Sequence, residues 1–113
     1  MLNQQVLNCI DACNACAVAC SRCATECLRE PSVKLLSKCI QLNLECAALC
    51  RSTSELLCLG SRCSDEICRL CVEACNACAE ECEKHGKNGF EHCMECAVAC
   101  RQCIEVCEQM ATV

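Results

Sequence analysis

Cysteine is the residue type through which this chain could do chemistry, because it makes up 21 of the 113 residues. In three stretches the cysteines are separated by alternating steps of three and four residues. These stretches contain Cys9, Cys13, Cys16, Cys20, Cys23 and Cys27; Cys68, Cys71, Cys75, Cys78 and Cys82; and Cys93, Cys96, Cys100, Cys103 and Cys107. In a helix this spacing keeps each set within an arc of roughly 80°. The cysteines would then occupy the heptad positions that face the centre of a helical bundle.

A further stretch, between the first two, follows the same pattern less regularly. Cys39, Cys46 and Cys50 share one helical face, and Asn43 stands where the pattern would place a fourth cysteine. We expect Asn43 to be a buried amide that hydrogen-bonds to a neighbour, because buried polar groups usually find such partners. The alternative is that Asn43 is a polar metal ligand or a gate. The sequence therefore predicts nineteen cysteines on four inward faces.

The elements that must position these cysteines are helices. Pro31, Gly60 and the segment 85–89 break the chain into segments rich in Ala, Leu, Glu, Arg and Gln, which are good helix formers. The predicted helices lie near 3–29, 32–59, 62–85 and 89–111. Short connections between helices of similar length favour antiparallel neighbours. We predict an all-α fold, in which residues 1–113 form one antiparallel up-down-up-down four-helix bundle with a cysteine-lined core.

The composition excludes several classes of function. The net charge of −5 comes from mixed acids and bases, and Phe90 is the sole aromatic residue, so we expect no nucleic-acid partner. We expect no membrane span, because no apolar stretch reaches the roughly 18–20 residues that a span needs. The first residues show no export signal, which favours a cytoplasmic protein. In that compartment thiols stay reduced, and cysteine-rich chains bind metal more often than they form disulfides.

Soft thiolates select copper(I), zinc or iron–sulfur clusters. The close Cys-x-x-Cys-x-x-Cys run of ferredoxins is absent. A zinc site with four cysteines carries two net negative charges, and burying many such charges costs several kcal/mol each. Copper(I) and thiolate in a one-to-one ratio are neutral, so we predict a store and buffer for on the order of 10 to 20 copper(I) ions. A sponge for zinc or for soft metals in general is the alternative.

We expect a binding protein and not an enzyme, because no Ser/His/Asp set, nucleotide loop or paired carboxylates are visible. A thiol redox protein is the enzymatic alternative, suggested by Cys-x-x-Cys pairs such as Cys68-Cys71 and Cys93-Cys96. These pairs lack the βαβ setting of redox motifs.

Four residues outside the regular pattern are additional candidates for the metal site. Cys58 and Cys63 flank Gly60 and lie roughly 100° from the cysteine faces of their helices. They are extra ligands, a reversible redox pair or incidental thiols, and we favour incidental thiols. His85 and His92 fall at one end of an antiparallel bundle. The opposite end carries a predicted apolar plug of Leu2, Val6, Leu57 and Met110.

We predict that copper is taken up at the histidine end. His85 follows Cys82 by three residues, so it would extend the column of ligands outward. For both histidines the alternative is a solvated loop residue, because a lone histidine coordinates only in a suitable context.

Five sequence features carry a resemblance to a known family. They are Cys9-x₃-Cys13-x₂-Cys16-x₃-Cys20, Cys39-Ile40-Gln41-Leu42 with Glu45-Cys46, Glu66-Ile67-Cys68-x₂-Cys71, Glu81-Cys82-Glu83-Lys84-His85, and His92-Cys93-x₂-Cys96-Ala97. With them the chain resembles the bacterial copper storage proteins, in particular their cytosolic branch, over nearly its whole length. The resemblance implies a four-helix bundle that assembles into a homotetramer and takes up many copper(I) ions through one end. A copper chaperone is a candidate partner.

Overall fold

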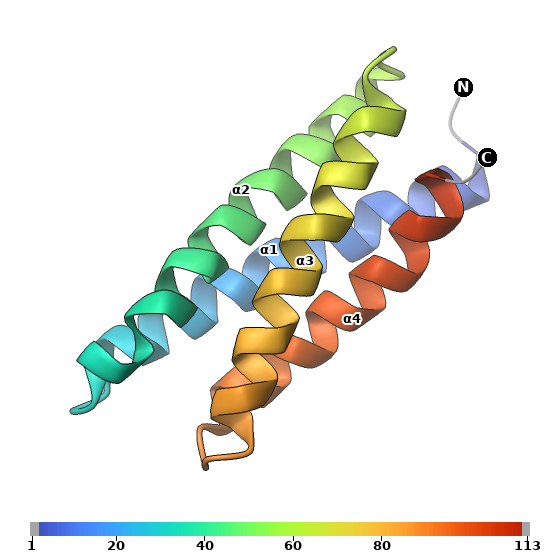
Figure 1. The fold of residues 1–113 in the computed structure, drawn as a ribbon. Helices are drawn as coiled ribbons and strands as arrows, with labels where there is room; N and C mark the ends of the chain where they lie inside the picture. The colour runs from blue at the N-terminus through green and yellow to red at the C-terminus, as the bar shows by residue number, and fades with distance from the viewer. Residues whose placement is uncertain (1–2, 112–113) are drawn as a thin grey trace.

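The structure is a computed structural model that describes residues 3–111. This part of the chain forms the α-helices α1 (Gln4–Arg29), α2 (Ser37–Leu59), α3 (Ser64–Gly86) and α4 (Glu91–Ala111), with a short 3₁₀-helix, η1 (Val33–Leu36), before α2 (Figure 1). It contains no β-strand. The predicted all-α four-helix bundle is confirmed.

The local sequence explains where the helices begin and end. The side chain of Asn3 caps α1 by accepting a hydrogen bond from the backbone N–H of Val6 at 2.9 Å. Pro31 follows α1 closely and prevents its continuation. Gly60 ends α2 in the left-handed conformation, with φ of 62°, a geometry that glycine adopts without steric cost. These cap and breaker residues set the lengths of the helices, and therefore how far the row of cysteines on each helix extends.

Each helix packs against two neighbours. α1 contacts α2 and α4, and α3 contacts the same two helices from the opposite corner. Figure 1 shows that the α1–α2 and α3–α4 connections lie at one end of the bundle, and that the α2–α3 turn lies at the other. The bundle is long and narrow, with extents of 47 × 19 × 17 Å.

The core is built from small side chains. Nineteen of the 21 cysteines are buried, and they are accompanied by alanines such as Ala17 and Ala79. Larger apolar side chains enter mainly towards the ends. Of the predicted apolar plug, Leu57 is buried, whereas Val6 and Met110 are partly buried against the core; Leu2 lies outside the described residues. Within the described residues, no helix has the length and apolar character needed to cross a membrane.

Candidate metal centre

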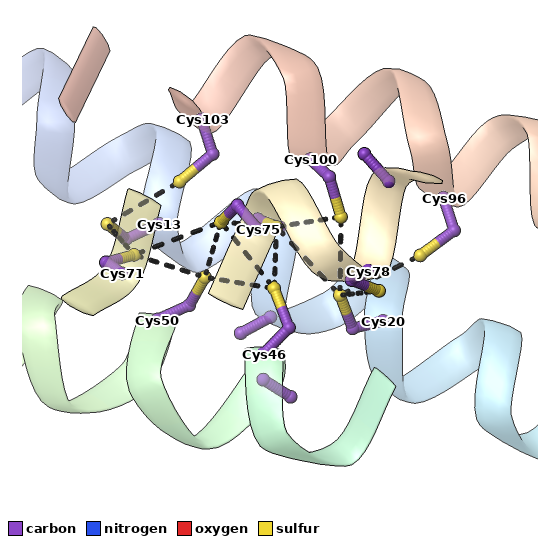
Figure 2. Close-up of a cluster of buried hydrophobic side chains, with 14 of the residues drawn as sticks. Cys13, Cys20, Cys46, Cys50, Cys71, Cys75, Cys78, Cys96, Cys100 and Cys103 are labelled. Atoms are coloured by element: carbon purple, nitrogen blue, oxygen red, sulfur yellow. Dashed lines mark hydrogen bonds between the residues drawn. The ribbon is translucent and has the colours of Figure 1, made fainter. Parts of the chain in front are cut away.

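The cysteine faces of the four helices meet along the axis of the bundle. Figure 2 shows the sulfur atom of Cys103 on α4 pointing towards that of Cys13 on α1, and the sulfur atoms of Cys46 and Cys50 on α2 joined to that of Cys75 on α3. All nineteen cysteines of the repeating pattern are buried and free. The heptad spacing therefore places the thiols inward, as predicted, and stacks them into one column, which we call the thiol column.

The sulfur atoms are separated by distances that suit shared metal ions. The Sγ atom of Cys16 lies 3.8 to 3.9 Å from four other sulfurs, those of Cys20, Cys46, Cys75 and Cys100. Two thiolates that bind one ion at about 2.3 Å, the zinc–thiolate length, lie roughly 3.8–4.6 Å apart, depending on the angle at the metal. Neighbouring sulfurs in the thiol column are thus near the separation that coordination requires.

The thiols gather into overlapping groups of four. In each group all four sulfurs lie within 4.8 Å of one another. Such groups include Cys13, Cys71, Cys103 and Cys107; Cys16, Cys46, Cys50 and Cys75; Cys16, Cys20, Cys46 and Cys100; Cys20, Cys78, Cys96 and Cys100; and Cys23, Cys27, Cys39 and Cys93. Each of these groups draws on three helices, and four cysteines belong to two groups each: Cys16, Cys20, Cys46 and Cys100. The three middle groups overlap, and short Sγ–Sγ contacts join the outer two to them: Cys71 lies 3.7 Å from Cys50, and Cys39 lies 3.7 Å from Cys82, which is 3.9 Å from Cys78. The groups therefore form a continuous series along the middle of the bundle.

Asn43 is fully buried within the thiol column. Its amide nitrogen donates to the Sγ atom of Cys39 at 3.8 Å. Its oxygen accepts from the thiols of Cys78 at 3.2 Å, Cys96 at 3.5 Å and Cys82 at 3.6 Å. The prediction that Asn43 is a hydrogen-bonded buried amide is confirmed, and its partners are all thiols.

The core thiols differ in how readily they ionise. Hydrogen bonds with Cys16, Cys20 and further thiols raise the pKa of Cys100, and burial adds a smaller shift in the same direction. Hydrogen bonds with Cys100 and Cys20 lower the pKa of Cys96 to about 3, although burial opposes this shift. A thiol with a raised pKa keeps its proton at neutral pH. A metal cation that binds there must therefore displace protons.

His85 is a buried residue in the last turn of α3. Its side chain is 2 % exposed, and its Nε2 atom lies 2.8 Å from a carboxylate oxygen of Glu81. Its Nδ1 atom is buried and has no hydrogen-bond partner among the described residues. The solvated-loop alternative for His85 is wrong, because α3 continues to Gly86 and keeps His85 on the inward face below Cys82. The sequence analysis did not predict that Glu81 is buried. The available signal was its position one helical turn before His85, which places the two side chains side by side.

His92 lies beside the column near the start of α4. It is half-buried, and its Nε2 atom lies 3.4 Å from the Sγ atom of Cys27. The ring of Phe90 packs edge-on between the two histidines, with its centroid 6.2 Å from that of His85 and 6.0 Å from that of His92. A small surface pocket lined by His92 also reaches Cys23 and Cys96. The histidine end thus places the imidazole of His92 next to a thiol, and that of His85 among the buried residues of α3, one helical turn beyond Cys82.

The structure keeps Cys58 and Cys63 apart from this arrangement. Both are exposed at the α2–α3 turn, at the end of the bundle opposite the histidines. This exposure agrees with their predicted offset from the cysteine faces.

The fold and the site together define a class of protein: a four-helix bundle whose interior is a continuous column of thiols. The chain belongs to the copper storage protein family, which matches it over residues 2–112. The predicted family is confirmed. No curated protein sequence matches the chain.

Solved structures of copper storage proteins share this fold. A cytosolic copper storage protein from Streptomyces lividans, with five coppers, is 35 % identical, with 97 % of this chain and 94 % of that chain covered and a TM-score of 0.93. The Streptomyces protein loaded with ten copper equivalents matches with the same identity and TM-score, over 96 % of this chain and 85 % of that one. Cu(I)-bound BsCsp3 of Bacillus subtilis is 42 % identical, with coverages of 96 % and 99 % and a TM-score of 0.88.

Proposed function

We propose that this protein is a cytosolic store for copper(I), and that its nineteen buried thiols are the ligands. The observation that carries the proposal is the series of overlapping four-sulfur groups. An isolated metal site would need one such group. A continuous series instead suits many ions that share bridging thiolates. The similar Streptomyces protein is described with five coppers and with ten copper equivalents, which supports multiple ions per chain.

The charges in the core favour copper(I) over zinc. Among the described residues, the buried polar or charged side chains are Asn43, Thr53, Ser54, Glu81 and His85, so no lysine or arginine lies within the core. A series of zinc sites with four thiolates each would accumulate uncompensated negative charge there. One copper(I) ion for each thiolate leaves the column neutral.

A storage role also fits better than thiol redox catalysis. The Cys68-Cys71 and Cys93-Cys96 pairs are buried, with each side chain at most 1 % exposed. A catalytic thiolate needs access to the disulfide of its substrate. We therefore propose that the protein is not an enzyme.

We propose that copper enters and leaves at the histidine end. His92 touches the thiol of Cys27, and the free Nδ1 atom of His85 offers one more nitrogen ligand just beyond Cys82. Deeper in the column, the oxygen of Asn43 accepts hydrogen bonds from three thiols, and it is a harder and therefore weaker candidate ligand than they are. Cys58 and Cys63 are incidental thiols in this proposal, because both are exposed at the opposite end.

We also propose a homotetramer, supplied by a copper chaperone. Four apolar side chains stand exposed on four different helices: Val18, Leu44, Leu70 and Val98. Contact between copies of the chain would cover them.

Anaerobic titration with copper(I) against a chromophoric copper(I) chelator tests the storage function. We expect tight saturation near one ion for each buried thiol. In a matched titration, zinc should saturate the protein at fewer ions per thiol, and a competing chelator should remove zinc more easily than copper(I). Saturation near one zinc for every four cysteines, together with weak copper binding, would contradict the proposal.

A further inference from the structure

Glu81 is a buried carboxylate at the histidine end, and both of its oxygens have partners. One oxygen lies 2.8 Å from Nε2 of His85, one turn further along α3. The other lies 4.0 Å from the ammonium group of Lys38 and 3.9 Å from that of Lys84. The carboxylate is 8 % exposed, whereas the two lysines are 74 % and 65 % exposed. The lysines therefore compensate the charge of Glu81 from the solvent side while its other oxygen faces the imidazole.

For an ionised Glu81 beside a neutral His85, this arrangement selects one of the two tautomers of the imidazole. An ionised carboxylate can only accept a hydrogen bond, so Nε2 of His85 must be the donor. A neutral imidazole has one N–H group, and Nδ1 is then left with a lone pair. That atom is buried and has no hydrogen-bond partner among the described residues. A buried lone pair one helical turn beyond Cys82, the last thiol of α3, is chemically suited to a metal ion.

We propose that Glu81 is a positioning residue that fixes His85 in the Nε2–H tautomer and so presents Nδ1 to an incoming copper(I) ion. A histidine that binds a metal through one nitrogen commonly donates its other N–H to a carboxylate, which sets the tautomer and orients the ring. Glu81 acts through His85 and does not itself bind copper. The inference rests on the proposed role of the histidine end in copper uptake.

The first test is independent of copper. Nitrogen-15 NMR of the metal-free protein reports the tautomer of His85, and we expect an unprotonated Nδ1. The Glu81→Gln variant keeps the size of the side chain, but its amide can either donate or accept, so both tautomers should become populated. Glu80→Gln, at an exposed neighbour on the same helix, is the matched control and should leave the tautomer unchanged. A protonated Nδ1 in the unmodified protein, or an unaltered tautomer in Glu81→Gln, would overturn the proposal.

The second test measures copper transfer from a copper(I)–chelator complex by stopped flow. Loss of such an outer partner typically weakens metal binding by about 10- to 100-fold, so Glu81→Ala should slow the earliest phase or weaken its apparent affinity within that range. In a His85→Ala background the same change should have no further effect. An equal effect of Glu81→Ala with and without His85 would refute positioning through the imidazole.

Total copper capacity separates this inference from the storage function. It should be the same in the unmodified protein and in every Glu81 variant, and circular dichroism should show the same helix content. A low capacity in the unmodified protein itself would refute storage, whereas the tautomer measurement would still decide the role of Glu81.

Discussion

Replacing the centre of the thiol column should remove copper sites without removing the fold. Cys16 lies 3.9 Å from Cys75 and 3.8 Å from Cys100, and all three are fully buried. Serine is close to cysteine in shape, but its hydroxyl is a hard ligand that copper(I) disfavours. If each bound copper(I) neutralises one thiolate, the triple Cys→Ser variant should hold about three fewer ions.

The same variant should be moderately less stable without metal. A buried hydroxyl with no partner costs about 1–3 kcal/mol. Serine in a helix can also bond to the carbonyl one turn earlier, which recovers part of this cost. We therefore expect each substitution to cost about 1 kcal/mol, the low end of that range. The three together should lower the free energy of unfolding by roughly 3 kcal/mol.

Anaerobic copper(I) titration and chemical unfolding of the metal-free protein measure these two effects. The double variant Cys58→Ser with Cys63→Ser is the matched control, because it also removes thiols but only exposed ones. It should keep the full capacity. If the triple variant binds as many ions as the unmodified protein with the same affinity, the column of shared thiolates is the wrong description of the site.

Three further predictions address other parts of the molecule. His85→Ala should slow copper(I) transfer from a chelator and leave the final capacity unchanged; equal transfer rates would contradict uptake through this imidazole. Gly86→Ala would place a Cβ atom 2.7 Å from Cε and 2.9 Å from Cβ of Met94, so thermal unfolding should reveal a loss of about 1–3 kcal/mol; an unchanged Tm would refute the close contact. The Arg101 guanidinium lowers the pKa of Glu83, so this pair stabilises the fold above the ordinary carboxyl pKa and loses its effect as the pH falls through the lowered value. Arg101→Ala should therefore cost about 0.2–1 kcal/mol at pH 7, and the difference in Tm should vanish in strong acid; a difference independent of pH would contradict the ion pair.

The fold and most of the candidate site could be predicted because one residue type carries the heptad pattern. Steps of three and four residues identify both the helices and their inward faces, and Pro31 and Gly60 separate them. Asn43 could be recognised as buried because it occupies a position within that pattern. Local sequence thus contained what was needed to place the thiol column.

The histidine end could not be predicted in the same way. Whether His85 is buried depends on the last turn of α3 and on how Phe90, just before α4, packs against it. Glu81 lies outside the cysteine pattern, and a carboxylate is usually exposed. Its burial goes with partners on two helices, Lys38 on α2 and His85 on α3. A pairing between helices leaves no periodic pattern in the sequence.

The long, narrow shape of the bundle links the amount stored to helix length. Seven residues advance a helix by about 10.5 Å and add two inward positions. Four helices lengthened together would gain about eight thiols, while the cross-section of 19 × 17 Å would stay the same. In a fold of this kind the number of bound ions and the outer surface area both increase in proportion to helix length. Each added layer of thiols packs in the same way as the layer before it.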